Sequence, residues 1–102
     1  MKNLLELIKT VDDHWYSVPL SKVNGHTVFL RVMNNHEAAF HSHNDSDELF
    51  FVLSGCLYLD IETRTQKLEQ GEAYTVKAGV RHRARVVGRA EMIVVSDIVE
   101  GQ

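Results

Sequence analysis

The feature that most constrains the fold of this chain is a series of short apolar segments separated by turn-forming residues. From Trp15 onward, runs rich in Val, Leu, Phe, Tyr and Thr alternate with breaks at Pro, Gly, Asn, Asp and Ser. This texture predicts short β-strands joined by tight turns. The candidate strands are 15–18, 26–33, 37–43, 48–53, 56–62, 65–68, 72–77, 82–87 and 90–97. Many short strands at near-regular spacing predict an all-β sandwich or barrel.

The first residues follow a different pattern. Apolar side chains recur at helical spacing and predict a short amphipathic helix over residues 3–12. They are Leu4, Leu5, Ile8 and Val11. Asn3 is a suitable N-cap, with Glu6 three residues further on. Because so short a helix is marginal on its own, we expect it to dock against the strands.

Length and charge narrow the organisation of the chain and its partners. The 102 residues leave room for one domain, predicted as a helical segment at 1–14 followed by a β-barrel at 15–98. A net charge of −3 argues against a nucleic-acid partner. The sequence shows no signal peptide and no apolar run near the ~18 residues of a membrane span, so no membrane partner is expected. The single cysteine, Cys56, cannot form an internal disulfide, and we expect a cytoplasmic protein.

His41 and His43 give the first indication of chemistry. If residues 37–43 form a strand, these two side chains point to the same face, about 6.6 Å apart along the chain. Glu48 follows a polar turn at 44–47, and a hairpin there would return its carboxylate to the same place. Imidazole and carboxylate groups that converge in this way can bind a common metal ion.

The spacing of these residues resembles that of the cupin superfamily. The first cupin motif, H-x-H, three or four residues, E, six residues and G, is met in full by His41, His43, Glu48 and Gly55. The second motif, G, five residues, P-x-G, two residues, H, three residues and N, is met at Gly71, Gly79 and His82. The resemblance is greatest to small single-domain cupins and covers residues 35–98. It implies a double-stranded β-helix, the jelly-roll cupin barrel.

The resemblance also implies a metal site. Its ligands would be His41, His43, Glu48 and His82. Three neutral imidazoles and one carboxylate suit one divalent transition metal ion, Fe, Mn, Ni, Co or Zn, and a six-coordinate ion would keep about two positions open. The chain departs from the motifs at Asn35, Lys77 and Val86, which stand where Gly, Pro and Asn are usual. None of these is a ligand position, so the expected metal site is unaffected.

Two classes of function fit such a site. The first is a metal-dependent enzyme of the dioxygenase or isomerase type that acts on a small chelating molecule in the barrel. The second is a non-catalytic barrel that binds or senses a small molecule, and a weaker third option is an ion that only stabilises the fold. No separate general base stands out in the sequence, so no catalytic residue is assigned.

Strand alternation predicts which side chains face the interior of the barrel. If Glu48 points inward, Phe50 and Val52 share its face. The outward side chains would then be Leu49, Phe51 and Leu53. Three large apolar groups either pack beneath the N-terminal segment or form a subunit interface. Together with the resemblance, this predicts a homodimer.

The same alternation applies to the strand that begins at His82, which would face inward. Its outward side, with the residue before it, would present a basic strip. We expect this strip to be a solvated edge that pairs with acidic residues, and a site for an anionic ligand or a partner is the less favoured alternative. The strip consists of Arg81, Arg83 and Arg85. The other histidines share no spacing with the predicted site and are expected on the surface or in loops rather than as ligands. They are His14, His26 and His36.

Overall fold

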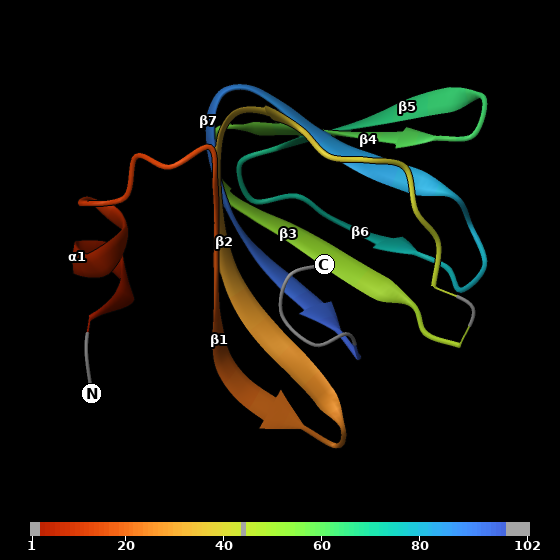
Figure 1. The fold of residues 1–102 in the computed structure, drawn as a ribbon, viewed down its shortest axis with the longest axis horizontal. Helices are drawn as coiled ribbons and strands as arrows, with labels where there is room; N and C mark the ends of the chain where they lie inside the picture. Colours follow the sequence, from red (N-terminus) through yellow and green to blue (C-terminus); the bar gives the residue numbers. More distant parts are fainter. Residues whose placement is uncertain (1–2, 44, 98–102) are drawn as a thin grey trace.

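The chain folds into a β-structure with one short helix at its N-terminal side (Figure 1). The computed structural model describes residues 3–43 and 45–97. The elements in this part are α1 (Leu4–Ile8), β1 (Trp15–Val23), β2 (His26–Glu37), β3 (Glu48–Ser54), β4 (Cys56–Ile61), β5 (Arg64–Glu69), β6 (Ala73–Val76) and β7 (His82–Ser96). Asn44 of the predicted turn and residue 98 of the predicted barrel lie outside the described residues.

The strands form an antiparallel sheet that curls around β7. The strand order is β1-β2-β7-β3-β6, and β4 pairs with both β5 and β7. The first part of β7 pairs with β4 at residues 82–85, and its last part pairs with β3 at residues 91–95. Between them lies Gly88, whose φ of +82° suits a bend, and Figure 1 shows β7 turning sharply between its two halves. The expected all-β jelly-roll architecture is confirmed.

Two predicted interruptions are absent from the observed strands. The predicted strands 82–87 and 90–97 are two parts of β7, because the ladder with β2 continues past Gly88 through an irregularity near Asn34. Pro19 does not end β1, which pairs with β2 as far as Val23. The pairing register shifts just after Pro19, and an edge strand with a bulge is where proline is tolerated.

The predicted strand at 37–43 is wrong. Strand β2 ends at Glu37, and the chain then contacts the backbone of β7 at two points among the described residues. The Ala38 N–H donates to the Ala84 carbonyl at 3.0 Å, and His41 and His82 form an isolated bridge. Two separated contacts do not make a continuous ladder, so the segment that carries the two histidines is a loop held against β7.

The core lies inside the curled sheet and is built from alternate residues of each strand. On β3, Glu48, Phe50 and Val52 are buried, whereas the residues between them are only partly buried. On β7, His82, Ala84 and Val86 are buried in the same way. The predicted inward faces of both strands are therefore confirmed.

A second apolar cluster covers the outer face of the sheet beneath α1. Ile8 of the helix packs with Leu30 and Val32, all at most 3% exposed, and Leu53 joins the cluster. Arg89 donates hydrogen bonds to the carbonyls of Val11 and Ile8, which fixes the end of the helical segment to β7. Of the two alternatives for the outward residues of β3, packing beneath the N-terminal segment therefore applies to Leu53.

The helix is shorter than the predicted 3–12. Asn3 caps it as predicted, because its Oδ1 accepts hydrogen bonds from Leu5 N–H and Glu6 N–H at 2.9 and 3.3 Å. The helix ends at Ile8, after which the amides of Thr10 and Val11 bond to carbonyls three residues back and tighten the chain into a turn. In the described part of the chain, no helix is long and apolar enough to cross a membrane.

The basic strip faces outward, and two of its members, Arg83 and Arg85, are paired with acidic side chains, as predicted. The carboxylate of Asp60 accepts hydrogen bonds from Arg85 Nε at 2.9 Å and from Arg83 Nε at 2.8 Å. The hydrogen bond from Arg85 is the largest cause that holds the pKa of Asp60 well below its usual range. Arg83 also contacts Glu37 at 2.7 Å, and Arg81 lies over the ring of Phe40. Two of the three arginines of the strip are thus neutralised by carboxylates.

Candidate metal centre

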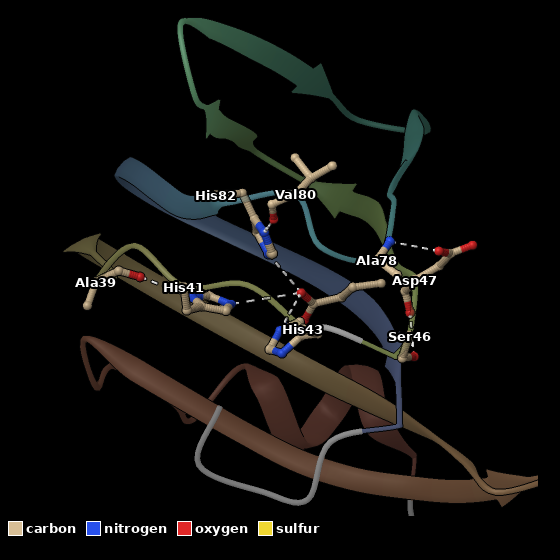
Figure 2. A network of polar contacts seen from close by, with 9 residues as sticks. Ala39, His41, His43, Ser46, Asp47, Ala78, Val80 and His82 are labelled. Atoms are coloured by element: carbon tan, nitrogen blue, oxygen red, sulfur yellow. Dashed lines mark hydrogen bonds and ion pairs between the residues drawn. The ribbon is translucent and has the colours of Figure 1, made fainter.

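One loop and the first residues of two strands bring the four predicted ligands together. His41 and His43 lie on the loop after β2, and Glu48 and His82 are the first residues of β3 and β7. The bridge between His41 and His82, in which each N–H donates to the other carbonyl at 2.9 Å, holds the loop against β7. Figure 2 shows the three imidazoles converging from opposite sides on one carboxylate oxygen.

Glu48 Oε1 lies at the centre of this cluster. Its distances to the Nε2 atoms of His82, His43 and His41 are 2.9, 3.3 and 4.0 Å. One ligand atom from each of the four residues can be chosen so that all lie within 4.8 Å of one another. This spread is what several donors arranged around one small cation require.

Backbone carbonyls orient two of the imidazoles. The Nδ1 atoms of His41 and His82 lie 3.0 and 2.9 Å from the carbonyls of Ala39 and Val80. Because a carbonyl oxygen only accepts hydrogen bonds, each Nδ1 must carry a proton and act as the donor. The Nε2 atom that faces the cluster is then the one that can bind a metal, an arrangement found in most metal-binding histidines.

Burial and mutual contacts shift the pKa values of three residues in the cluster. Burial is the largest single effect on His82 and would lower its pKa, but the hydrogen bonds to Glu48 and to the Val80 carbonyl and the charge of Glu48 together raise it. Burial is also the largest single effect on Glu48 and would raise its pKa, but the hydrogen bond and charge of His82, with the charges of Arg31 and His43, together lower it. For His41, burial dominates and lowers the pKa, which favours the neutral imidazole that metals bind.

The residues present fit a divalent cation. His43 Nε2 is buried and, among the described residues, makes no hydrogen bond, although it lies 3.3 Å from Glu48 Oε1. Leaving a buried ring nitrogen without a partner costs free energy, and a cation at the centre of the cluster would satisfy it. A cation there would also take the place of the proton shared by His82 and Glu48.

The loop between His43 and Glu48 is held by the segment that precedes β7. Asp47 Oδ1 accepts a hydrogen bond from Ala78 N–H at 2.9 Å, and its other oxygen contacts Lys77 Nζ at 3.2 Å. Gly79 N–H donates to the His43 carbonyl at 2.7 Å. The backbone bond from Ala78, followed by Lys77, lowers the pKa of Asp47. Lys77, which replaces the usual Pro of the motif, thus joins the two motifs through Asp47.

A cavity of about 410 Å³ opens beside the cluster, and two of the four predicted metal ligands, His41 and Glu48, line it. Its lining residues are Trp15, Arg31, His36, Ala38, Ala39, His41, Glu48, Phe50 and Ala84. A volume of this size accommodates a small organic molecule. An ion held by the cluster would border this cavity, because His41 and Glu48 belong to both.

Sequence reasoning missed two side chains of this cavity. Arg31 is only 4% exposed and lies on β2 between the buried Phe29 and Met33. A charged residue at an inward position of a predicted strand was the available signal. Burial lowers the pKa of Arg31 to about 10 against the opposing effect of Glu48, which leaves the guanidinium charged at neutral pH. The ring of Trp15, 4.3 Å from the guanidinium carbon, covers it.

The remaining histidines lie outside the cluster. His14 and His26 are exposed, as predicted. His36 is not part of the cluster but, contrary to the expectation of a surface or loop position, it is a half-buried residue of β2 that lines the cavity. Its ring packs against Trp15 with the centroids 5.6 Å apart. The extension of β2 past residue 33, which the predicted strand 26–33 did not include, is what carries it there.

Comparison with known proteins agrees with this architecture. Residues 28–96 match the profile of the family described as Cupin domain, and this stretch includes all four residues of the cluster. The chain is 37% identical over 86 residues to the uncharacterized protein YdbB of Bacillus subtilis, a match that covers 83% of this chain and 75% of YdbB. The chain therefore belongs to the cupin family.

Solved structures share the fold. A cupin-2 domain containing protein from Shewanella frigidimarina superposes with a TM-score of 0.83 at 23% identity, covering 92% of this chain and 91% of that one. A cupin superfamily protein from Desulfitobacterium hafniense gives a TM-score of 0.79 at 18% identity, covering 91% and 85%. At these identities the likeness concerns the fold, and the site must be argued from the residues of this chain.

Proposed function

We propose that this cupin binds one divalent transition metal ion through His41, His43, Glu48 and His82, and that a small chelating molecule reaches the ion from the adjacent cavity. The observation that carries the proposal is the convergence of four ligand atoms within 4.8 Å at the wall of a cavity of about 410 Å³. Three imidazoles and a carboxylate are a ligand set for Fe, Mn, Ni, Co or Zn.

We further propose that the centre is catalytic, of the dioxygenase or isomerase type, rather than a sensor. The bound ion would supply Lewis acidity or a site for O₂. The protein would supply the rest: apolar walls from Phe50 and Ala84 exclude water, and Arg31 fixes a positive charge beside the site. His36, on the same wall, offers an imidazole that can exchange a proton with a bound molecule. Tight binding without product would identify a sensor instead.

The metal proposal is tested by elemental analysis of the purified protein beside a His41→Ala, His43→Ala double variant. We expect about one equivalent of a transition metal in the wild type and near-complete loss in the double variant, because two of four ligands are removed. A His26→Ala variant alters an exposed histidine at the start of β2, at the opposite end of the strand from the loop that carries His41. It should keep its metal. A wild-type protein that holds no metal after reconstitution would contradict the proposal.

We also propose a homodimer, located in the cytoplasm, where its single thiol needs no partner. Leu49 and Phe51 lie on the outward face of β3, and Leu49 is paired with the partly buried Val95. These side chains continue the apolar face beyond the part that contains Leu53. A dimer through this face would cover them.

Light scattering should therefore give twice the mass of the chain. Leu49→Glu should shift the protein to the monomer, since a charge at a buried interface is strongly unfavourable. Val23→Glu, at an exposed apolar position of the β1–β2 hairpin, should leave the mass unchanged. A monomeric wild type would refute the dimer.

A further inference from the structure

Phe40 comes directly before the first histidine of the cluster and contacts two arginines of the basic strip. The guanidinium carbons of Arg81 and Arg83 lie 4.8 and 4.7 Å from the centroid of its ring. At these distances a guanidinium is attracted to the face of an aromatic ring. The two arginines flank His82 in the sequence and face outward. Phe40 therefore holds the loop from outside the barrel, while the imidazole of His41 enters the cluster.

Arg83 joins this loop to two strands. Its Nη1 atom contacts Glu37 Oε1 at 2.7 Å, and Glu37 is the last residue of β2 before the loop. Its Nε donates to Asp60 Oδ2 on β4 at 2.8 Å. Arg83 is thus anchored on β4 and contacts the loop both where it begins and at Phe40. We refer to Phe40, Arg81 and Arg83 as the outer clamp.

His41 is the ligand whose position depends most on the outer clamp. Its side chain is 33% exposed, against 13% for His43 and 1% for His82. Its Nε2 atom is also the farthest of the three from Glu48 Oε1, at 4.0 Å. His43 follows on the same loop, but its carbonyl accepts a separate hydrogen bond from Gly79 N–H. A segment held by few contacts opens readily, so each contact that keeps His41 in place matters.

We infer that Phe40 and Arg83 are positioning residues for His41: the outer clamp keeps the loop closed on β7 and thereby slows the release of a bound metal ion. Because His41 is the most exposed ligand, its withdrawal opens the cluster to water, and the ion leaves through that open state. The effect on the ion rests on the proposed function. The effect on the loop rests on the contacts of the outer clamp alone.

Hydrogen exchange of the whole chain without metal tests the loop directly. The His41 N–H donates to the His82 carbonyl at 2.9 Å, so its protection factor reports how often the loop opens. In Phe40→Ala we expect this protection factor to fall about tenfold, because two cation–π contacts are lost and each shifts an exposed equilibrium about two- to fivefold. Phe40→Tyr keeps the ring and should retain the wild-type value. The Gly71 N–H, which donates to the Val52 carbonyl at 2.8 Å in the β5–β6 turn, is the internal reference and should not change.

Arg83→Met and Arg85→Met form a matched pair of variants. Both arginines are bonded to Asp60, and their side chains are similarly exposed, at 27% and 29%. Arg85 donates to Asp60 through Nε and Nη2 and stacks on Tyr58 of β4, whereas the ring beside Arg83 belongs to the loop. Arg83→Met should therefore lower the His41 protection factor about threefold, the loss of one cation–π contact. Arg85→Met should leave it unchanged.

The rate of zinc release tests the effect on the ion. When zinc-loaded protein is mixed with excess chelator, Phe40→Ala should release zinc about tenfold faster than the wild type, because the outer clamp stabilises the closed loop with and without the ion. The equilibrium affinity for zinc should change much less, because the ion also enters through the open state. Circular dichroism and zinc content show that each variant is folded and loaded. If Phe40→Ala does not fold, Phe40→Leu, which keeps an apolar side chain without the ring, takes its place.

The outcomes separate this inference from the metal proposal. An unchanged His41 protection factor in Phe40→Ala, or equal changes in Arg83→Met and Arg85→Met, would overturn the inference and leave the metal centre intact. Unchanged zinc release from a variant whose loop opens more often would overturn it as well, since the position of His41 would then not control the ion. If no metal binds, the metal proposal fails, and amide exchange alone decides the inference.

Discussion

Replacing Gly55 by alanine is expected to prevent stable folding. Gly55 joins β3 to β4 with φ of +84°, and a Cβ built there would lie 2.2 Å from the carbonyl oxygen of Arg89 and 2.8 Å from Cα of Ala90. Both are backbone atoms of β7, so no side chain can rotate away. The left-handed conformation alone costs an alanine about 1–3 kcal/mol.

The clash adds to that strain because β7 must move to relieve it. Since β7 pairs with β2, β3 and β4, its displacement would break ladders on both sides of the structure. We expect a total loss above about 4 kcal/mol in the free energy of unfolding, a large part of the roughly 5–15 kcal/mol that small domains have. Urea unfolding followed by circular dichroism, or failure to obtain soluble protein, would show this.

Gly25→Ala is the matched control. Gly25 has nearly the same φ, +83°, but nothing lies within 4 Å of the position where its Cβ would stand. The Gly25→Ala variant should lose only the part of the free energy of unfolding that comes from the left-handed conformation. Equal destabilisation of the two variants would show that β7 yields at Arg89 without cost and that the contact is not what requires glycine at Gly55.

Gly55 illustrates what the sequence could and could not predict. Its motif position marked the end of a strand, but the reason for glycine there, the close approach of β7, is a tertiary contact between residues far apart in the chain. Inward faces were predictable because alternation is local: Glu48, Phe50 and Val52 are buried as their spacing requires. Where a strand ends depends on which neighbouring strand is available to pair with it, and this is not a local property of the sequence. The loop at His41 therefore could not be distinguished from a strand.

The residues of the candidate site were predicted partly from an incorrect local structure. His41 and His43 were expected on one face of a strand, whereas they lie on a loop held at His82 and Gly79, with their ring centroids 4.8 Å apart. The motif spacing identified the residues that converge, although the local structure assumed for them was incorrect. Arg31 was not predicted because it lies outside the two cupin motifs. The one signal in the sequence was a charged residue at an inward-facing position of a predicted strand.

Glu48→Gln should have the largest effect on the metal centre. Glu48 Oε1 lies within 4.0 Å of the Nε2 atoms of all three histidines, and the amide removes its charge with little change in shape. Mutation of a residue that only hydrogen-bonds a metal ligand typically lowers metal affinity about 10–100-fold. Loss of the anionic ligand itself should therefore lower zinc affinity by more than about 100-fold. Competition with a zinc indicator would measure it.

The same substitution should also weaken the metal-free protein. It leaves Arg31 and His82 without the buried carboxylate that balances them, and the loss of one member of a buried ion pair costs roughly 3–5 kcal/mol. Glu37→Gln is the control, because that exposed carboxylate pairs with Arg83 at the surface, where an ion pair contributes about 0–1 kcal/mol. If Glu48→Gln kept wild-type zinc affinity while its stability fell, Glu48 would be a structural counter-charge for Arg31 and His82, and the metal would be held by the histidines alone.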